Sequence, residues 1–165
     1  MRKNIFQYSG ILFITIIMIC ILSVRCGRNV LFEKNYRIEK HTWNYNDTLT
    51  FVTNIADTAD FHDILVHIRN GGLYDYSNIF LFIEVIAPSG QHIKDTMEIK
   101  LADSRGKWYG SGLGDIKSMM VPYKTNIRFR VPGIYTFKLI QGMRKEELQH
   151  VFDIGLRIQN SKSHS

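Results

Sequence analysis

Short segments in which apolar and polar residues alternate recur along the chain, and this two-residue period is typical of β-strands with one buried face. Residues 63–70 show the pattern clearly, because Ile64, Val66 and Ile68 fall on one face. In residues 48–53 the threonines are predicted to point outward. The other side chains predicted to point inward are Leu49, Phe51, Ile127, Phe129, Val131, Tyr135, Phe137, Leu139, Phe152, Ile154, Leu156 and Ile158.

The most apolar run after the N-terminal region is residues 77–86, whose Ile, Val and Phe content favours a strand. A turn follows, since Pro88 presets the φ of its second position and Gly90 accepts the positive φ that closes it. Residues 91–101 are therefore predicted to return antiparallel to the first strand. We expect this hairpin to form the centre of one sheet.

Turn signals separate the remaining predicted strands. Asn70-Gly71-Gly72 and Pro132-Gly133 mark two turns, and the charged residues 142–149 predict a single helical turn or a loop. Further strands are expected over 48–53, 63–70, 126–131, 134–141 and 151–159. About seven to nine short strands without a long helix after the leader predict an all-β fold, an antiparallel β-sandwich of jelly-roll or immunoglobulin-like type.

The N-terminal segment has the features of an export signal. Arg2 and Lys3 precede an apolar run at residues 11–24, and Cys26 follows. The residues before Cys26 are similar to a lipoprotein cleavage box, which predicts a lipid on Cys26, although Arg25 stands where small residues are expected. Extended at its start, the run approaches about 20 residues, so an uncleaved membrane anchor is the alternative. Both interpretations place the domain beside a membrane and outside the cytoplasm.

These signals divide the chain into four parts. They are 1–25, a lipoprotein signal peptide or membrane anchor; 26–42, a tether and first extended segment; 43–159, the β-sandwich domain, with Trp43 as a core aromatic; and 160–165, a disordered tail.

Composition removes several classes of function. The net charge of +6 includes Arg2, Lys3 and Arg25, and without them 18 basic and 15 acidic residues leave +3, too little to indicate nucleic-acid binding. The only cysteines, Cys20 and Cys26, fall in or beside the leader, so the domain has no disulfide.

No local motif indicates catalysis. The densest group of metal-ligand types is Asp60-Phe61-His62-Asp63 with His67 nearby, but its spacing fits no common zinc site and a solvated loop is expected. The glycines around Trp108 lack the Lys-Ser/Thr or the following helix of a phosphate loop. We therefore predict no enzyme activity, no cofactor and no metal.

Two places are candidates for binding. Trp108 and Tyr109 stand in a glycine-rich loop, where exposed rings could stack on sugars or anchor a partner protein, although core packing is the default interpretation for Trp108. Arg128 and Arg130 point outward in the predicted strand and would form a basic strip with Lys124 and Lys138, the alternative being scattered surface charges. The other rings expected at loops are Tyr74, Tyr76 and Tyr123.

Many short matches in one order carry a resemblance to a known family. They are Val30-Leu31-Phe32-Glu33, Tyr36, Trp43, Asp47, Phe51, Arg69-Asn70, Tyr76 to Leu81, Pro88-Ser89-Gly90, Lys94-Asp95-Thr96, Ala102-Asp103, Gly106 to Gly112, Asp115-Ile116-Lys117, Asn126 to Phe129, Pro132 to Tyr135, Met143-Arg144 and Asp153 to Ile158. In this order the chain resembles the GldH family of gliding-motility lipoproteins from Bacteroidota.

The resemblance implies a non-enzymatic envelope lipoprotein of the gliding machinery, with partners among gliding or type IX secretion proteins; a carbohydrate-binding envelope lipoprotein is the alternative. Gly27 and Arg28 stand where surface-displayed lipoproteins of Bacteroidota carry acidic residues, which favours a periplasm-facing attachment. Thr48, Thr58 and Thr96 each follow an aspartate and precede an apolar residue, a pattern similar to the O-glycosylation acceptor of Bacteroidota.

Overall fold

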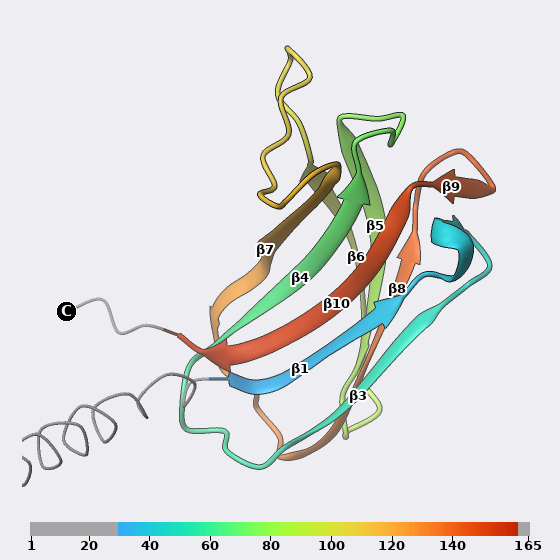
Figure 1. Ribbon diagram of the computed structural model, residues 1–165. Helices are drawn as coiled ribbons and strands as arrows, with labels where there is room; N and C mark the ends of the chain where they lie inside the picture. The colour runs from blue at the N-terminus through green and yellow to red at the C-terminus, as the bar shows by residue number, and fades with distance from the viewer. Residues whose placement is uncertain (1–29, 162–165) are drawn as a thin grey trace, which may run out of the picture.

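Two four-stranded antiparallel sheets pack face to face in the computed structural model, which describes residues 30–161 (Figure 1). The strand order is β1-β10-β4-β7 in one sheet and β3-β8-β5-β6 in the other, and β2 and β9 form a separate small pair. The elements are β1 Val30–Arg37, the 3-10 turn η2 Glu39–His41, β2 Thr42–Asn44, β3 Leu49–Ile55, β4 His62–Gly71, β5 Asn78–Ile86, β6 His92–Lys100, β7 Ile116–Ile127, β8 Gly133–Gln141, β9 Glu147–Gln149 and β10 Val151–Asn160.

The strands pair from the outside of the chain inward. β1 pairs with β10, β3 with β8, β4 with β7 and β5 with β6. Successive pairs lie in alternate sheets, as when one long hairpin is rolled around a core. This nesting is the jelly-roll arrangement. The predicted all-β, antiparallel sandwich is confirmed, and its topology is the jelly roll of the two alternatives.

The core lies between the two sheets and contains most of the side chains that the alternation placed inward on the internal strands. The inward placement is wrong for Phe152 of β10, because the register shifts between Val151 and Asp153 and Val151 is buried in its place. Ile64, Val66 and Ile68 of β4 are buried, as are the predicted residues of β8. The outward placement of the threonines in residues 48–53 is wrong for Thr53, which is buried while Val52 is exposed. Thr53 shares the face of Phe51, two residues earlier, so the two-residue period turns it inward.

The predicted hairpin of β5 and β6 is confirmed. Gly90 takes a φ of +81° and its N–H donates to the Ala87 carbonyl at 2.9 Å, which closes the turn. Its expected place at the centre of a sheet is wrong for one strand, because β6 is an edge and β8 is the other internal strand.

The strand expected at residues 126–131 is wrong. β7 ends at Ile127, and Arg128 to Val131 form a loop in which Phe129 is buried and Val131 is 39% exposed. β7 itself was missed because it is an edge strand whose residues are mostly half-buried and do not alternate. It also contains Pro122, which an edge strand tolerates.

Three further segments differ from the prediction. Residues 142–149 end in β9, which pairs with β2 through Trp43 and Leu148. The first extended segment is β1, a member of a sheet, so the sandwich begins at Val30 rather than at residue 43. Asn160 belongs to β10, although it was assigned to the tail.

Residues 1–29 and 162–165 lie outside the described part of the chain, and with them the predicted leader or anchor, Cys26 and the last four residues of the predicted tail. Within residues 30–161, no helix is both long and apolar enough to cross a membrane.

The sandwich has two ends that differ. At one end, which we call the entry end, Val30 pairs with Gln159, and His62 pairs with both Asn160 and Ile127. The opposite end, which we call the far end, holds the connections at residues 72–77, 101–115 and 142–146. Figure 1 shows that residues 101–115 leave the sheets at the end opposite the start of β1.

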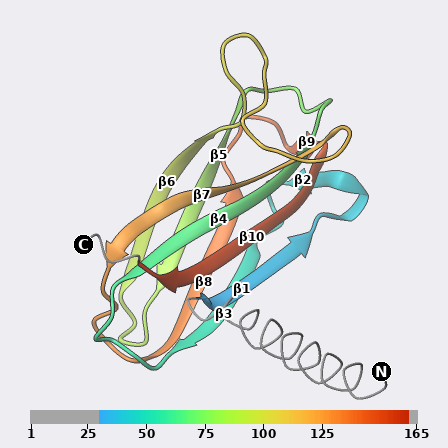
Figure 2. The same cartoon turned by 60° about the vertical axis from the view of Figure 1, so that its left-hand side comes forward.

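The edges of the two sheets are joined along β6 and β7, which lie side by side in Figure 2. The Tyr123 hydroxyl donates to the Asp95 carboxylate at 2.8 Å, and Lys124 forms an ion pair with the same carboxylate at 2.8 Å. The hydrogen bonds from Lys124 and Tyr123 hold the pKa of Asp95 below its ordinary value.

Candidate functional site

The connection between β6 and β7 is a folded hairpin rather than a loose loop. The Tyr109 N–H donates to the Leu101 carbonyl at 2.8 Å, and the Asp103 N–H donates to the Lys107 carbonyl at 2.9 Å. The Asp103 carboxylate accepts from two backbone N–H groups of the turn, at 2.8 and 2.9 Å. Gly106, with a φ of +79°, completes the turn. The shape of this connection is therefore set before any partner binds.

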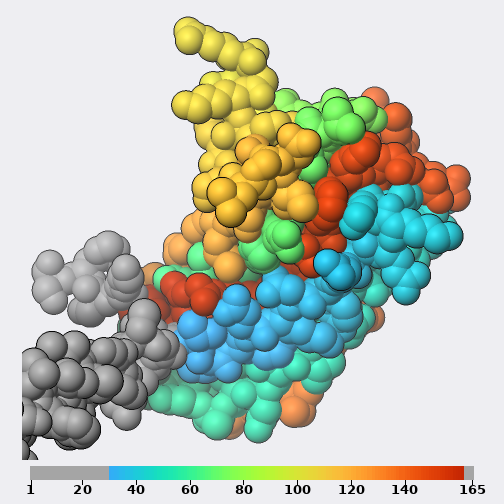
Figure 3. Space-filling view, in the orientation of Figure 1, coloured from blue at the N-terminus to red at the C-terminus, as the bar shows by residue number. Residues whose placement is uncertain are grey.

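The hairpin separates its two candidate rings. Trp108 forms a β-bridge with Ala102 and packs half-buried against the core, whereas Tyr109 is 58% exposed. Leu113 is 99% exposed and Leu73, in the neighbouring connection, is 74% exposed. Figure 3 shows the atoms of this connection projecting beyond the sheets. Leu73, Tyr109 and Leu113 are the exposed large hydrophobic side chains of these two connections, and we call them together the far-end patch.

The other rings predicted at loops are buried or half-buried. Tyr74 is buried and its hydroxyl donates to the Asn78 carbonyl at 3.2 Å, and burial raises its pKa well above the ordinary value. Tyr76 and Tyr123 pack partly buried against the core, and Tyr123 lies on β7 rather than in a loop. Of the five candidate rings, only Tyr109 has more than half of its surface exposed to solvent.

The four cations do not form one strip. Lys138 forms an ion pair with Glu84 at 3.4 Å on the outer face of β8, and Lys124 is paired with Asp95 at the sheet edge. Arg128 and Arg130 lie in the loop after β7, and the Arg128 guanidinium lies 4.6 Å from the Phe61 ring centre. These arginines are at the entry end, so the two predicted binding surfaces lie at opposite ends of the sandwich.

A hollow opens between the sheets at the entry end. Its volume is about 370 Å³, and Arg128 and Arg130 are among the residues around it. Its apolar walls include Val85, Ile93, Phe129, Val131, Tyr135 and Phe137. No local pattern in the sequence predicts this entry hollow, because its walls come from several strands and connections.

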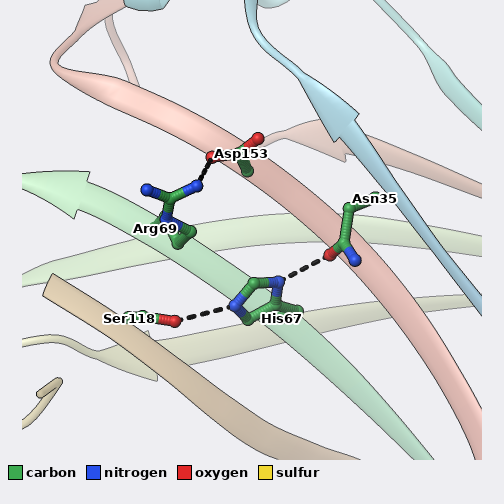
Figure 4. Close-up of polar contacts among 5 residues, drawn as sticks. All are labelled: Asn35, His67, Arg69, Ser118 and Asp153. Carbon is green, nitrogen blue, oxygen red and sulfur yellow. Dashed lines mark hydrogen bonds and ion pairs between the residues drawn. The ribbon is translucent and has the colours of Figure 1, made fainter. Parts of the chain in front are cut away.

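A polar network crosses the outer face of the β1-β10-β4-β7 sheet (Figure 4). The Ser118 hydroxyl lies 2.8 Å from His67 Nε2, and Asn35 Oδ1 lies 2.5 Å from His67 Nδ1. Since an amide oxygen only accepts, Nδ1 carries the proton and Nε2 accepts from the hydroxyl. Beside them Arg69 and Asp153 form an ion pair at 2.7 Å. Burial is the main cause that lowers the pKa of His67.

The order Ser118, His67, Asn35 is that of a nucleophile, a base and an orienting group. Acyl transfer also needs donors for the oxyanion, and the backbone N–H of the nucleophile is one common source. In this chain the Ser118 N–H donates to the Ser111 carbonyl at 2.8 Å. We therefore interpret the network as a structural link between β1, β4 and β7.

The solvated loop expected around His62 is wrong. His62 begins β4 and is fully buried, with its ring centre 5.3 Å from that of Phe129. Neither ring nitrogen of His62 has a hydrogen-bond partner among the described residues. In residues 30–161 no three side chains of the His, Cys, Asp or Glu types are grouped so as to hold a metal ion.

The three candidate glycosylation sites differ in access. Thr48 is exposed in the connection before β3, not within a strand as expected, and Thr96 is exposed on β6. Thr58 is half-buried in the connection between β3 and β4. The modification of these threonines stays a prediction.

Similarity to solved structures is weak. The chain aligns with a crystal structure of dimeric latent PorU from Porphyromonas gingivalis at 10% identity and a TM-score of 0.38, over 84% of this chain and 14% of that one. The VP2 subviral particle of infectious bursal disease virus gives 12% identity and a TM-score of 0.34, over 77% of this chain and 32% of that one. Neither likeness carries an argument about function.

Similarity to named proteins is much stronger. A protein of Christiangramia forsetii described as "Gliding motility lipoprotein GldH homolog" is 33% identical over 86% of this chain and 90% of its own length. The "Gliding motility lipoprotein GldH" of Flavobacterium johnsoniae is 28% identical over 92% of this chain and 95% of its own length. The family model described as GldH lipoprotein matches residues 30–158, and the chain therefore belongs to the GldH lipoprotein family.

Proposed function

We propose that this protein is a non-enzymatic, membrane-tethered binding domain of the gliding-motility machinery and the type IX secretion apparatus linked to it. A lipid on Cys26 holds the entry end at the membrane, with the domain facing the periplasm. The far-end patch binds another envelope protein of that machinery. The observation that carries the proposal is that the connection at residues 101–115, which carries the exposed Tyr109 and Leu113, lies at the end opposite the start of β1 (Figure 1).

Three features of the chain support a tethered binding domain. A lipoprotein family implies a membrane-anchored protein of the cell envelope. Val30, the first residue of β1, follows Cys26 by only four residues, so an anchor at Cys26 is close to the entry end. The far-end connection is held by its own backbone hydrogen bonds, so little conformational entropy is lost when it binds.

A protein partner is favoured over a glycan. Sugar recognition by stacking uses exposed aromatic rings, and Tyr109, at 58%, is the only one of the five candidate rings that is more than half exposed. Leu73 and Leu113, on the connections of the same end, are exposed and aliphatic and suit an apolar protein surface. Catalysis is not part of the proposal, because the Ser118 N–H, one common oxyanion donor, already donates to the Ser111 carbonyl.

The test is capture of partners from the native envelope. The full-length protein and a Tyr109→Ala/Leu113→Asp variant are expressed in the native host, cross-linked in intact cells and recovered after solubilisation. We expect the variant to recover its cross-linked partners about tenfold less efficiently, because anchor residues near the centre of an interface carry most of its binding energy.

A matched control is Val52→Asp, which changes a 53% exposed side chain on the outer face of β3 and should leave recovery unchanged. Equal recovery of partners by the wild-type protein and the far-end variant would contradict the proposed binding surface. The anchor is tested separately, by incorporation of a fatty-acid probe into wild-type protein and its absence in Cys26→Ala.

A further inference from the structure

The entry hollow joins an apolar interior to a cationic mouth. Val85, Ile93 and Phe137 are inner-face residues of β5, β6 and β8 that line it. Phe137 is fully buried, whereas Val85 and Ile93 are left partly open because β7 ends at Ile127. Ile93, for example, is 46% exposed although its position faces inward. The volume of about 370 Å³ lies in the range of pockets that bind small molecules.

The cations at the mouth differ in their ion pairing within residues 30–161. Lys124 is paired with Asp95 at 2.8 Å. By contrast, no carboxylate within residues 30–161 forms an ion pair with Arg128 or Arg130, both of which are exposed. Guanidinium groups bind phosphate and carboxylate through paired hydrogen bonds. An apolar cavity with two such groups at its mouth fits a molecule with an apolar tail and an anionic head.

The position of the hollow indicates where such a molecule comes from. Val30 pairs beside the end of β10, Asn160 pairs with His62, and His62 pairs with Ile127, the residue before Arg128. The four residues from Cys26 to Val30 span at most about 14 Å when extended. A lipid at Cys26 therefore keeps the mouth of the hollow near the lipid headgroups, a step that rests on the proposed anchoring.

We propose that the entry hollow binds one acyl chain of an anionic phospholipid of the membrane, whose phosphate contacts Arg128 and Arg130. The lipid on Cys26 alone leaves the domain free to rotate about its tether. A second lipid held at the hollow fixes the orientation of the sandwich, with the far-end patch directed away from the bilayer. The hollow would then orient the domain toward its partner as well as strengthen its attachment to the membrane.

The test uses the full-length protein reconstituted in vesicles of phosphatidylethanolamine and phosphatidylglycerol. A small fraction of the phosphatidylglycerol carries a photoreactive group on its acyl chain, and labelled residues are identified by peptide mass spectrometry after illumination. We expect label on hollow residues such as Ile93 and Phe129. Arg128→Glu/Arg130→Glu should reduce this label about tenfold, because two attractions for the anionic head become repulsions.

Two further variants separate the hollow from general effects. Arg105→Glu/Lys107→Glu makes the same change of charge in exposed residues of the far end, and should leave the label unchanged. Ile93→Trp fills the mouth of the hollow and should reduce the label without changing the charge. Flotation of each variant with the vesicles and its circular dichroism report anchoring and folding.

Specific outcomes would overturn the inference. Equal labelling by a photoreactive phosphatidylcholine would remove the role of the arginines, and label retained in both hollow variants would place the lipid elsewhere. In a further control, the photoreactive group is on the acyl chain attached to Cys26 and the vesicles contain no photoreactive phospholipid. Label on hollow residues in that control would show that the anchor's own chain occupies the hollow. Protein that fails to float contradicts the proposed anchoring, whereas protein that floats without label in the hollow contradicts the lipid site alone.

Discussion

The two ends of the sandwich share one hydrophobic core but differ in how the chain covers that core. At the far end the chain continues beyond the sheets as a hydrogen-bonded hairpin, and Tyr109 and Leu113 face solvent. At the entry end the sheets stop unevenly, and apolar inner-face residues line a hollow under Arg128 and Arg130. One end therefore displays apolar side chains on its surface, and the other encloses them behind positive charge.

A single edge strand, β7, accounts for much of this difference. At its start Ser118 pairs with Ser111, which extends the strand pairing into the far-end connection. At its finish, β7 leaves the sheet at Ile127 while the β5–β6 hairpin continues to its turn. An edge strand has one unpaired side, so it can extend or stop without disturbing the centre of the sheet. In this jelly roll, the edge strand β7 thus determines how the surfaces of the two ends differ.

The largest effect is expected from Trp43, which holds β2 and β9 against the core at the far end. Trp43 is fully buried, and its indole N–H donates to the Asp47 carbonyl at 2.9 Å. Trp43→Ala should lower the free energy of unfolding in urea by about 3–5 kcal/mol, through the cavity and the lost burial. Tyr45→Ala, at a 47% exposed position close by, should change it by less than about 0.5 kcal/mol. Equal effects of the two changes would contradict this role.

The second prediction concerns His62, at the entry end. A buried polar group without a hydrogen bond costs about 1–3 kcal/mol, and neither nitrogen of the buried His62 ring has a partner among the described residues. His62→Leu should therefore raise the urea midpoint, by about 1 kcal/mol in unfolding free energy. A fall in stability would mean that the imidazole makes a hydrogen bond in solution. His92→Leu, on the exposed face of β6, serves as the control.

The sequence pattern predicted the internal strands and the edge strands β3 and β6, but it failed at the edge strand β7 and at the short pair β2 and β9. β4, β5 and β8 lie between two neighbours and pack one face on the core, so their inward residues follow the two-residue period. β7 packs on one neighbour only and contains Pro122, and the period is lost. β2 and β9 have three residues each, too few for any period to appear.

The glycine-rich connection with Trp108 and Tyr109 was singled out from the sequence, with core packing as the default for Trp108. Its bridge to Ala102 and its half-buried position agree with that default, whereas Tyr109 is exposed. The entry hollow could not be predicted from the sequence, because its wall residues come together only after both sheets form. The same holds for the His67 network, whose members come from three strands.

The smallest effect is expected from His67, which lies on the sheet between the two ends and joins β1 to β7 through Asn35 and Ser118. Its pKa is lowered in the folded state, chiefly by burial, so the unfolded chain binds the proton more strongly. Stability is therefore complete above the ordinary histidine pKa of about 6.5 and falls as the pH drops below it. In urea titrations at pH 7.5 and pH 5, the wild-type protein should lose more stability on acidification than His67→Gln, because the variant has no imidazole to protonate. The same loss in both proteins would show that His67 does not titrate with folding. The network would then be a pH-independent link between the strands that reach the far end and the entry end.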